Sequence, residues 1–269
     1  MNIWKNLTLL ARHIRLNLVV YKVYERYLWN QIKDKRIPEH IGFILDGNRR
    51  WASLQDVPRL LGHRAGVDKV DALVDWCIEA GIKSITLYAF STENFTRSPE
   101  EVAGLMSIFD EKLKAIATDE RIHRNRVHVR VIGRLSLLPE STQRLAHAAE
   151  ALTRDYDRHF LNIALAYGGR AEIVDAAKQI ALKAKEGKIG VESIDEKMIS
   201  EHMYTAHLPK QEPDLIIRTS GEERTSGFLL WQGAYSELSF SDVFWPEFRR
   251  IDLWRAIRTY QRRKRRYGT

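Results

Sequence analysis

The residues best suited to chemistry follow a short apolar run near the start of the chain. Residues 41–45 read as a buried strand. The residues that follow it are Asp46, Gly47, Asn48, Arg49, Arg50 and Trp51. A glycine turn between a strand and a helix leaves backbone N–H groups free to meet phosphate, and a carboxylate beside it can hold the divalent cation that accompanies phosphate. The stretch also suits an ordinary turn with solvated arginines, because Asp-Gly and Asn turns are common.

Five short β-branched or apolar runs recur along the chain with helix-like segments between them. The runs cover residues 41–45, 84–90, 127–132, 161–166 and 215–218, with a weaker sixth at 238–240. Alternating strands and helices predict an α/β fold, in which a single domain holds a mainly parallel six-stranded sheet flanked by helices. The expected helices cover residues 66–80, 99–122, 139–154, 171–185, 195–204 and 253–266.

Polar, glycine-marked or arginine-bearing loops follow four of the expected strands. These loops cover residues 46–51, 91–97, 167–170 and 219–226. In open α/β sheets, ligands bind beyond the carboxyl ends of the strands. Each loop alone suits a solvated connection, but four of them at one sheet edge favour a shared anionic site.

Arginines and carboxylates in or near these loops indicate what that site would bind. The arginines are Arg50, Arg59, Arg97, Arg218 and Arg224. A guanidinium is a planar fork of donors that suits a diphosphate. The carboxylates expected at the same edge are Asp46, Glu93 and Glu237, which suit Mg²⁺ held by one or two carboxylates together with substrate oxygens.

Several neighbouring side chains have both a functional and a structural interpretation. His63, in LLGHRAG, can donate to phosphate or cap a helix. Trp51 and Phe95 can line a site that admits an apolar group, or belong to the core. The helix expected after Pro99 carries an apolar stripe suited to packing against the sheet. The stripe consists of Val102, Leu105, Met106, Phe109 and Leu113.

Composition excludes several classes of protein. With 269 residues, 44% of them hydrophobic, the chain can bury one large core. The single cysteine, Cys77, excludes an intrachain disulfide and a cysteine-rich zinc site, and a cytoplasmic location is the default expectation. No run approaches the roughly 18 apolar residues of a spanning helix. The chain also lacks the glycine-rich phosphate loop and the dinucleotide fingerprint, which disfavours nucleotide enzymes.

The formal net charge of +8 is concentrated at the two ends of the chain. Residues 1–37 carry eight Lys and Arg against two acidic residues, and residues 249–269 carry nine against one. The middle is therefore net acidic, and no nucleic-acid partner is expected, although the RRKRR tail keeps a basic nucleic-acid-binding protein as an alternative.

From about His40 to Gly268 the chain resembles the cis-prenyltransferases, the family of undecaprenyl diphosphate synthase and dehydrodolichyl diphosphate synthase. The motifs that carry the resemblance are FILDGNRRWA, LLGHRAG, LYAFSTENFTRSPEEV, IGR, LNIALAYGGRAEIV, DLIIRTSGEERTSGFLLWQGAYSEL, VFWPEF and RRYG. The resemblance implies a homodimeric, Mg²⁺-dependent enzyme. It would add isopentenyl diphosphate units in cis to farnesyl or geranylgeranyl diphosphate, an allylic starter, to make a glycosyl-carrier lipid precursor.

The resemblance also implies roles for individual residues. Asp46 would serve Mg²⁺ and the departure of diphosphate, with Glu237 as a second carboxylate that in some members reaches the metal with help from the dimer partner. The allylic diphosphate would meet Gly47, Asn48, Arg49, Arg50, Arg59 and His63. Isopentenyl diphosphate would meet Arg218, Arg224, Thr225 and Ser226. The apolar stripe after Pro99 would form one wall of a hydrophobic tunnel between sheet and helices.

Residues of the expected loop 91–97 would surround the reacting carbons. They are Ser91, Thr92, Glu93, Asn94, Phe95 and Arg97. Asn94 matches the position usually proposed as proton acceptor, but a neutral amide is a poor base, so a diphosphate oxygen is the alternative acceptor.

Three departures from the bacterial pattern affect substrate preference. Arg49 stands where glycine is frequent, Phe95 where tryptophan is frequent, and Gly227 where asparagine commonly follows the serine. The double arginine resembles archaeal and eukaryotic members, which allows a longer starter. The alternative function is a non-catalytic scaffolding subunit of a heteromeric prenyltransferase, against which the presence of Asp46 and Asn94 argues.

Residues 1–36 lie outside the closest resemblance and form an expected N-terminal extension, followed by a catalytic domain of residues 37–269. Apolar residues recur in the extension at helical spacing among lysines and arginines. Such a basic amphipathic helix suits either docking on its own protein or peripheral contact with an anionic membrane surface, at the inner face of the membrane.

Overall fold

The computed structural model describes residues 19–263. They divide into two compact units. The larger unit takes residues 38–248, and the smaller takes residues 19–37 together with residues 249–263. The boundary lies close to the expected end of the extension, but the last helix of the expected catalytic domain groups with that extension.

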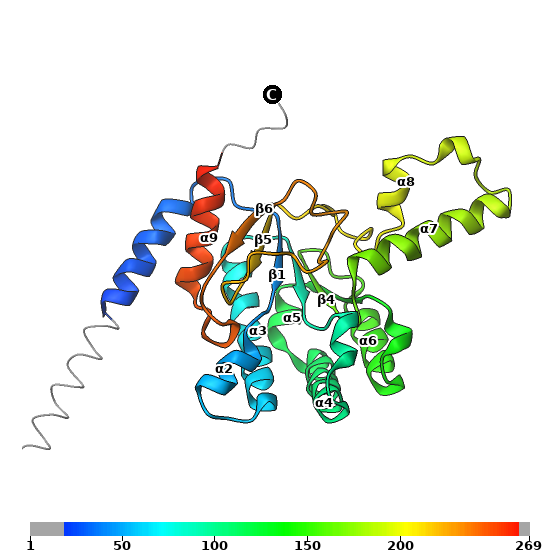
Figure 1. The fold of residues 1–269 in the computed structure, drawn as a ribbon. Helices are drawn as coiled ribbons and strands as arrows, with labels where there is room; N and C mark the ends of the chain where they lie inside the picture. Colours follow the sequence, from blue (N-terminus) through cyan, green and yellow to red (C-terminus); the bar gives the residue numbers. More distant parts are fainter. Residues whose placement is uncertain (1–18, 264–269) are drawn as a thin grey trace, which may run out of the picture. The chain divides into compact units, whose positions relative to one another are not determined.

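The larger unit is built on one six-stranded sheet, in which every pair of neighbouring strands is parallel (Figure 1). The strands are β1 His40–Ile44, β2 Ser84–Tyr88, β3 Val127–Ile132, β4 His159–Ala164, β5 Leu215–Arg218 and β6 Glu237–Phe240. Their order is β3-β4-β2-β1-β5-β6. Every residue of β1 and β2 is buried, as expected of central parallel strands covered on both faces. The predicted six-stranded parallel α/β fold is confirmed.

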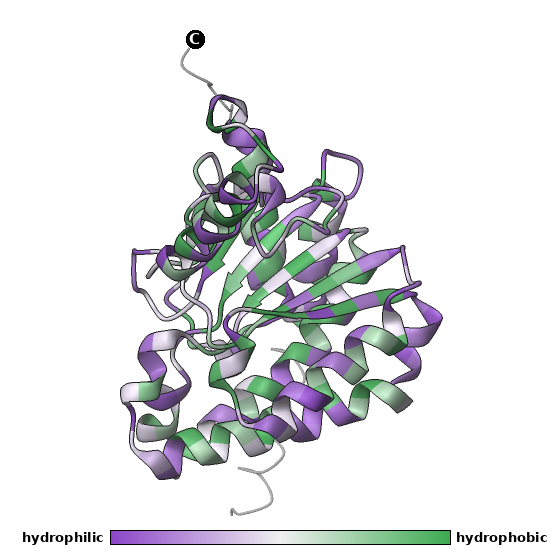
Figure 2. Cartoon of the chain, turned by 90° about the vertical axis from the view of Figure 1, so that its right-hand side faces the viewer, coloured by the Kyte–Doolittle hydropathy of each residue, from purple (hydrophilic) through white to green (hydrophobic). Residues whose placement is uncertain are grey.

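The helices of this unit connect successive strands. They are α2 Asn48–Leu54, α3 Arg59–Glu79, α4 Pro99–Ala115, α5 Glu120–Arg124, α6 Glu140–Thr153, α7 Gly169–Lys185 and α8 Glu196–Glu201. Figure 2 shows largely hydrophobic strands beside helices in which hydrophobic and hydrophilic residues alternate. The helices therefore cover the sheet with their apolar sides.

Several helix predictions were wrong in their limits. The helix predicted over residues 195–204 ends at Glu201, and the one predicted over residues 253–266 begins at Arg250. The sequence predicted a helix beginning at residue 66, whereas α3 begins at Arg59. It is preceded by α2, of which only a helix start after the glycine turn was expected. The helix predicted over residues 99–122 is interrupted by a 3₁₀ turn at Ile116–Thr118. Asp119 then caps α5, because its side chain accepts a hydrogen bond from the backbone N–H of Arg121.

Glycines let α2 and α3 approach the end of β1. Gly47 has a φ of 104°, a left-handed conformation that favours glycine and turns the chain from the strand into α2. A Cβ atom on Gly66 of α3 would collide with the side-chain oxygen of Asn48. These two positions bring the start of α2 and the first turns of α3 to the same sheet edge.

The apolar stripe of α4 is mostly core. Leu105, Met106, Phe109 and Leu113 are buried, whereas Val102 is half-buried. Between α4, α3 and the sheet lies an apolar cavity of about 160 Å³. The hydrophobic tunnel expected between the sheet and the helices stays a prediction.

The smaller unit pairs residues 19–32, which are helical, with α9, Arg250–Arg262. Leu28 is fully buried, the rings of Trp29 and Trp254 lie 4.9 Å apart, and Glu25 forms an ion pair with Arg250 at 3.0 Å. One face of the extension is thus docked on its own protein.

The expected apolar positions before residue 19, and the expected helical residues after 263, lie outside the described residues. Within the described chain, no helix is both long and apolar enough to span a membrane.

Candidate active site

Asp46 lies just beyond the carboxyl end of β1, where backbone and arginine donors converge on its carboxylate. Its Oδ2 accepts a hydrogen bond from Arg218 Nη2 at 2.8 Å, and its Oδ1 accepts one from the Gly47 N–H at 2.6 Å. Arg50 Nη2 lies 3.4 Å from Oδ1. Burial raises the pKa of Asp46, but the hydrogen bond and charge of Arg218 and the charge of Arg50 outweigh burial, so this pKa lies below its ordinary value. Asp46 is therefore an ionised carboxylate at neutral pH.

Arg218 connects Asp46 to the loop that follows β5. It is the last residue of β5, pairs with Ile44 of β1, and is almost fully buried. Its Nη1 donates to Ser226 Oγ at 2.8 Å and to the backbone oxygen of Arg224 at 2.6 Å. Arg218 and Ser226 thus come together as expected.

The other two residues predicted in this loop lie differently. The Arg224 side chain is exposed and pairs with Glu222. The backbone oxygen of Thr225 accepts a hydrogen bond from the Phe228 N–H at 3.0 Å, which closes the turn. In this structure the backbone of residues 224–225, rather than their side chains, supports the site.

Arg50 is held by residues that the sequence reasoning did not single out. Its Nη2 donates to Ser220 Oγ at 2.5 Å, and its Nη1 donates to Glu222 Oε1 at 3.1 Å. Both partners lie in the polar loop after β5, so the signal that could have found them was the loop's position at the sheet edge.

Glu101 is the principal residue that the sequence reasoning missed. Its Oε1 lies 3.0 Å from His63 Nε2, 3.4 Å from Arg97 Nη1 and 3.7 Å from Arg49 Nε. Its Oε2 lies 3.8 Å from Arg59 Nη1, and its side chain is only 8% exposed. The i,i+4 spacing of Arg97 and Glu101 was the available signal.

The pKa values of His63 and Glu101 determine which of the two side chains donates in their hydrogen bond. Burial lowers the pKa of His63 and outweighs the opposing hydrogen bond to Glu101. Burial raises the pKa of Glu101, but the hydrogen bond to His63 and the charges of Arg49 and Arg97 bring it below its ordinary value. Glu101 is therefore ionised and His63 neutral near pH 7, with Nε2–H of His63 donating.

Asn94 sits in a 3₁₀ turn, Thr92–Thr96, that follows β2. Its Oδ1 accepts a hydrogen bond from the backbone N–H of Ser91 at 3.0 Å. The backbone N–H of Thr92 in turn donates to the Tyr167 backbone oxygen at 3.0 Å, which ties this turn to the loop after β4. The oxygen atom of Asn94 that would accept a proton is thus already used to build the turn.

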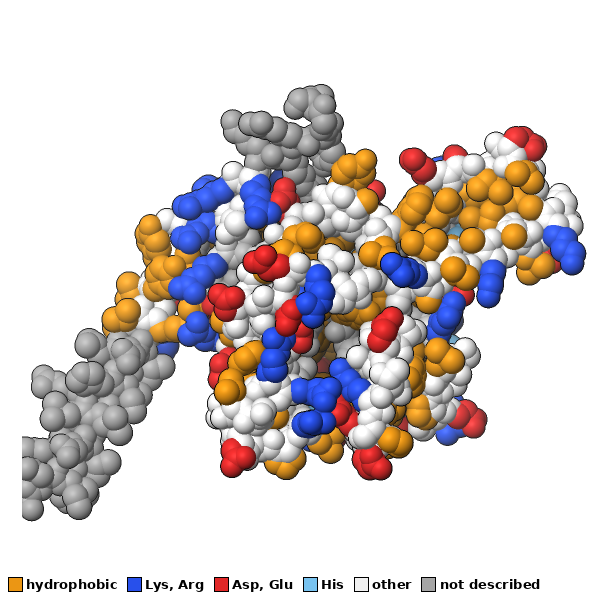
Figure 3. Space-filling model, viewed as in Figure 1, with side chains coloured by type: hydrophobic (Ala, Val, Ile, Leu, Met, Phe, Trp, Pro, Cys, Tyr) orange, Lys and Arg blue, Asp and Glu red, His pale blue; other side chains and the backbone are white. Residues whose placement is uncertain are grey.

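Two adjoining cavities of about 730 and 470 Å³ open on this edge of the sheet. Both are lined by Leu45, Asp46, Asn48, His63 and Arg97. The larger is also lined by Gly47, Arg49, Arg50 and Arg59, and the smaller by Ser91, Glu93, Asn94, Arg218 and Ser226. Figure 3 shows basic and acidic side chains gathered together near the middle of the view. Two polar cavities that share Asp46 can hold two anionic groups side by side.

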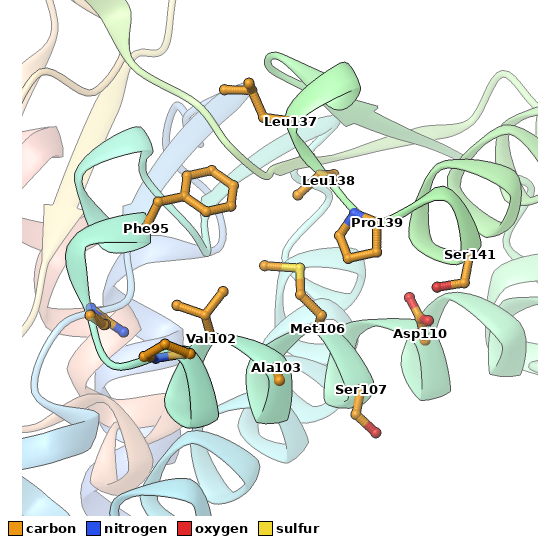
Figure 4. A pocket seen from close by; sticks show the side chains of 12 residues that line it. Phe95, Val102, Ala103, Met106, Ser107, Asp110, Leu137, Leu138, Pro139 and Ser141 are labelled. Atoms are coloured by element: carbon orange, nitrogen blue, oxygen red, sulfur yellow. The ribbon is translucent and has the colours of Figure 1, made fainter.

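The remaining predicted residues line neither cavity. These are Trp51, Thr92, Phe95, Arg224, Thr225 and Glu237. Trp51 donates from Nε1 to Glu247 at 3.1 Å. Phe95 instead faces an open groove of about 810 Å³, whose apolar side chains include Val102, Met106 and Leu138 (Figure 4).

The expectation that Glu237 shares a sheet edge with Asp46 was wrong for a single chain. Glu237 is the first residue of β6 and pairs with Leu215, the first residue of β5. Because all strands are parallel, Glu237 lies at the amino edge of the sheet, and Asp46 lies at the carboxyl edge.

The donors around Asp46 allow a test of the expected Mg²⁺ site. Among residues 19–263, no three His, Cys, Asp or Glu side chains cluster closely enough to form a complete metal site. Mg²⁺ is usually held by one or two carboxylates together with substrate phosphates. A single ionised carboxylate with a 30% exposed side chain, beside arginines that can hold those phosphates, fits this arrangement.

The chain is similar to known proteins along almost its whole length. A profile of the family described as "Putative undecaprenyl diphosphate synthase" matches residues 44–268. The tritrans,polycis-undecaprenyl-diphosphate synthase (geranylgeranyl-diphosphate specific) of Methanocaldococcus jannaschii is 52% identical over 252 residues, which cover 94% of this chain and 90% of the relative. The relative of the same name from Methanopyrus kandleri is 50% identical over 260 residues, which cover 96% and 95%.

Two solved structures share the fold. Lavandulyl diphosphate synthase from Lavandula x intermedia, in complex with dimethylallyl diphosphate, aligns with a TM-score of 0.82 and 35% identity over 87% of this chain and 99% of that one. A probable undecaprenyl diphosphate synthase from Campylobacter jejuni aligns with a TM-score of 0.71 and 29% identity over 87% and 100%.

Proposed function

Since this chain belongs to the cis-prenyltransferase family and is a prenyl-transferring enzyme, we propose that it elongates geranylgeranyl diphosphate with successive isopentenyl units. The pair of polar cavities that share Asp46 carries this proposal. The geranylgeranyl specificity in the names of the two archaeal relatives supports this starter over farnesyl diphosphate. The product would be a long polyprenyl diphosphate, a precursor of a glycosyl-carrier lipid.

The larger cavity would take the allylic diphosphate and the smaller would take isopentenyl diphosphate. Arg49, Arg50 and Arg59 line only the larger cavity, whereas Arg218 and Ser226 line only the smaller. Arg97 and His63 line both, so they would face both diphosphates. Guanidinium groups bind phosphate oxygens through paired, charge-assisted hydrogen bonds.

The proposed reaction joins the two substrates at their reacting carbons. The C–O bond of the allylic diphosphate breaks, and its electron pair leaves with the diphosphate. The alkene of isopentenyl diphosphate bonds to the allylic carbon, and loss of a proton leaves a new Z double bond. Arginines fixed beside the departing group stabilise the negative charge that grows there. Repetition lengthens the chain.

Asp46 would hold Mg²⁺ together with substrate oxygens. When bound, Mg²⁺ supplies further positive charge to the departing diphosphate. The Arg218 and Gly47 donors keep the Asp46 carboxylate ionised and fix its direction. A proton would pass to a diphosphate oxygen, because the Asn94 oxygen already accepts the Ser91 N–H. Asn94 would then position substrate through its amide N–H₂.

We also propose a homodimer, in which Glu237 of a second copy would approach Asp46. Exposed apolar residues on and after α7 support a protein partner on that face, which Figure 3 shows as a hydrophobic area over α7 and α8. These residues are Val174, Leu182, Val191 and Ile194. Asp46→Ala and Glu237→Ala subunits should each be inactive alone, and should regain roughly a quarter of wild-type activity when they are mixed, dissociated and reassociated. Random pairing makes about half of the dimers mixed, and each mixed dimer has one intact site out of two. No recovery would contradict a shared site.

The proposed function is tested with purified protein, labelled isopentenyl diphosphate, and either geranylgeranyl or farnesyl diphosphate. We expect long polyprenyl products, a higher kcat/KM with geranylgeranyl diphosphate, and no product when EDTA replaces Mg²⁺. A purified protein that elongates neither starter would instead support the non-catalytic scaffolding subunit.

A further inference from the structure

The apolar cavity of about 160 Å³ begins directly behind the candidate active site. Leu45 lines this cavity and both polar cavities, and Ala89 lines this cavity and the smaller polar one. Its walls include apolar side chains from several elements, among them Val70 on α3, Phe109 on α4 and Ile163 on β4. An apolar space that adjoins the allylic diphosphate cavity suits the hydrocarbon of the proposed substrate.

Charged side chains line the same cavity away from the active site. Lys112 Nζ lies 3.0 Å from Asp71 Oδ2 and 3.0 Å from Asp68 Oδ1. Arg121 Nη2 lies 3.2 Å from Asp71 Oδ1. Asp71 therefore joins α3 to both α4 and α5. Lys112 follows Glu101 by eleven residues along α4, which places it about 16 Å further along the helix axis.

The interruption of the helix predicted over residues 99–122 creates this arrangement. The 3₁₀ turn at Ile116–Thr118 ends α4, and Asp119 begins α5. The Asp119 carboxylate also pairs with the Arg121 guanidinium at 2.6 Å, which directs Arg121 toward Asp71 and toward Asp75, at 3.6 Å. A continuous helix would have carried Arg121 in a different direction.

We propose that Asp71, with Lys112 and Arg121, forms an ionic closure at the far end of the hydrocarbon cavity and limits the length of the product. This inference rests on the proposed function. The cavity is too small for a long polyprenyl chain, so elongation must enlarge it or open its end. These ion pairs are partly exposed, and such pairs contribute little free energy to stability. The free energy gained by burying a further five-carbon unit of the hydrocarbon is larger. A growing chain can therefore break these ion pairs. Breaking them has a cost in free energy, and this cost disfavours the addition of each five-carbon unit that must pass the closure.

The test compares product lengths made by the full chain from geranylgeranyl diphosphate, Mg²⁺ and isopentenyl diphosphate. Asp71→Asn keeps the side-chain shape but removes the charge that pairs with both Lys112 and Arg121. We expect its most abundant product to be longer than that of the wild type by at least one five-carbon unit. Lys112→Met should shift the distribution in the same direction, and serves as a second variant if the first folds poorly.

Glu111→Gln is the matched control. Glu111 pairs with Arg64 at 3.0 Å and also joins α4 to α3, but neither residue lines the cavity. Its products should keep the wild-type length. If the wild type elongates and Asp71→Asn leaves the length unchanged, or if Glu111→Gln lengthens products equally, the closure is wrong. Failure of the wild type to elongate any starter would overturn the proposed function and the closure with it.

Discussion

Arg218 donates from Nη2 to Asp46 Oδ2 at 2.8 Å, from the end of β5 to the end of the neighbouring strand β1. The same guanidinium donates from Nη1 to Ser226 Oγ at 2.8 Å. Arg218 and Ser226 line only the smaller cavity, while Asp46 lines both. The Arg218 side chain therefore fixes the position of Asp46, which lines both cavities, relative to Ser226, which lines the smaller one.

Replacing Arg218 by lysine should weaken binding of isopentenyl diphosphate. Lysine keeps the charge but cannot donate in two fixed directions, so it cannot hold Asp46 and Ser226 at once. Hydrogen bonds to charged groups contribute about 1.5–3 kcal/mol, so we expect KM for isopentenyl diphosphate to rise on the order of 10- to 100-fold. Steady-state kinetics at saturating allylic diphosphate measure this. An unchanged KM would contradict the assignment of the smaller cavity.

Glu101→Gln should reduce use of the allylic diphosphate. The carboxylate is the common partner of His63 and three arginines, and a neutral amide cannot orient them as strongly. We expect kcat/KM for the allylic substrate to fall by roughly tenfold, which corresponds to about 1.4 kcal/mol. Glu100→Gln, on the exposed side of the same turn, should leave kcat/KM unchanged. Equal loss in both variants would indicate a general effect on α4.

Acid should destabilise the larger unit through buried neutral histidines. Burial lowers the pKa of His40 to about 4 and that of His207 to about 3. Their rings lie near Thr86 and Asn162, at 2.8 and 2.9 Å. Between the unfolded pKa of about 6.5 and these folded values, only the unfolded chain takes up the protons, so stability falls as pH falls.

The size of this effect can be measured by urea unfolding at pH 7.5 and pH 5. Each buried histidine should lower the free energy of unfolding by about 1.4 kcal/mol per pH unit within that window. His40→Gln should reduce the pH dependence, whereas His147→Gln, at an exposed position, should not. A His40→Gln protein with the full wild-type pH dependence would exclude His40 as a source.

The described part of the N-terminal extension leads us to expect binding to anionic membranes. Val19, Val20, Val23 and Tyr27 are all more than half exposed, on the helix whose Leu28 is buried. Lys22 and Arg26 lie among them, and a basic residue near an anionic surface contributes about 1 kcal/mol. Val23→Asp should therefore weaken binding to phosphatidylserine vesicles in flotation assays. Leu152→Asp, a control on α6, should bind like the wild type, and equal loss in both would remove the proposal.

Much of the fold could be predicted because parallel strands carry strong local signals. Residues 127–132 and 215–218 were predicted with the limits that β3 and β5 have. A helix start was expected after Gly47, but the extent of α2 was not predicted, because it has only seven residues and no side chain caps its start. The Pro99 signal marked the start of α4, but the capping role of Asp119 was not recognised.

The site was less predictable where it depends on sheet position and long-range packing. Asp46 and Arg218 could be placed together because Asp46 follows one strand and Arg218 is the last residue of another. Glu237 was misplaced because it precedes the expected sixth strand, residues 238–240, and in a parallel sheet a residue before its strand lies at the amino edge. Glu101 was missed because its partner His63 comes from another helix, 38 residues earlier in the chain.

We propose that two diphosphate cavities meet at Asp46 in a self-sufficient enzyme. The most direct test of this claim is incorporation of labelled isopentenyl diphosphate onto geranylgeranyl diphosphate by purified wild-type protein and Asp46→Asn, both with Mg²⁺. We expect long Z-polyprenyl products from the wild type, and a rate at least roughly 100-fold lower from the variant, since it loses a charge at the departing diphosphate. Equal rates, or no product from the wild type, would contradict the claim.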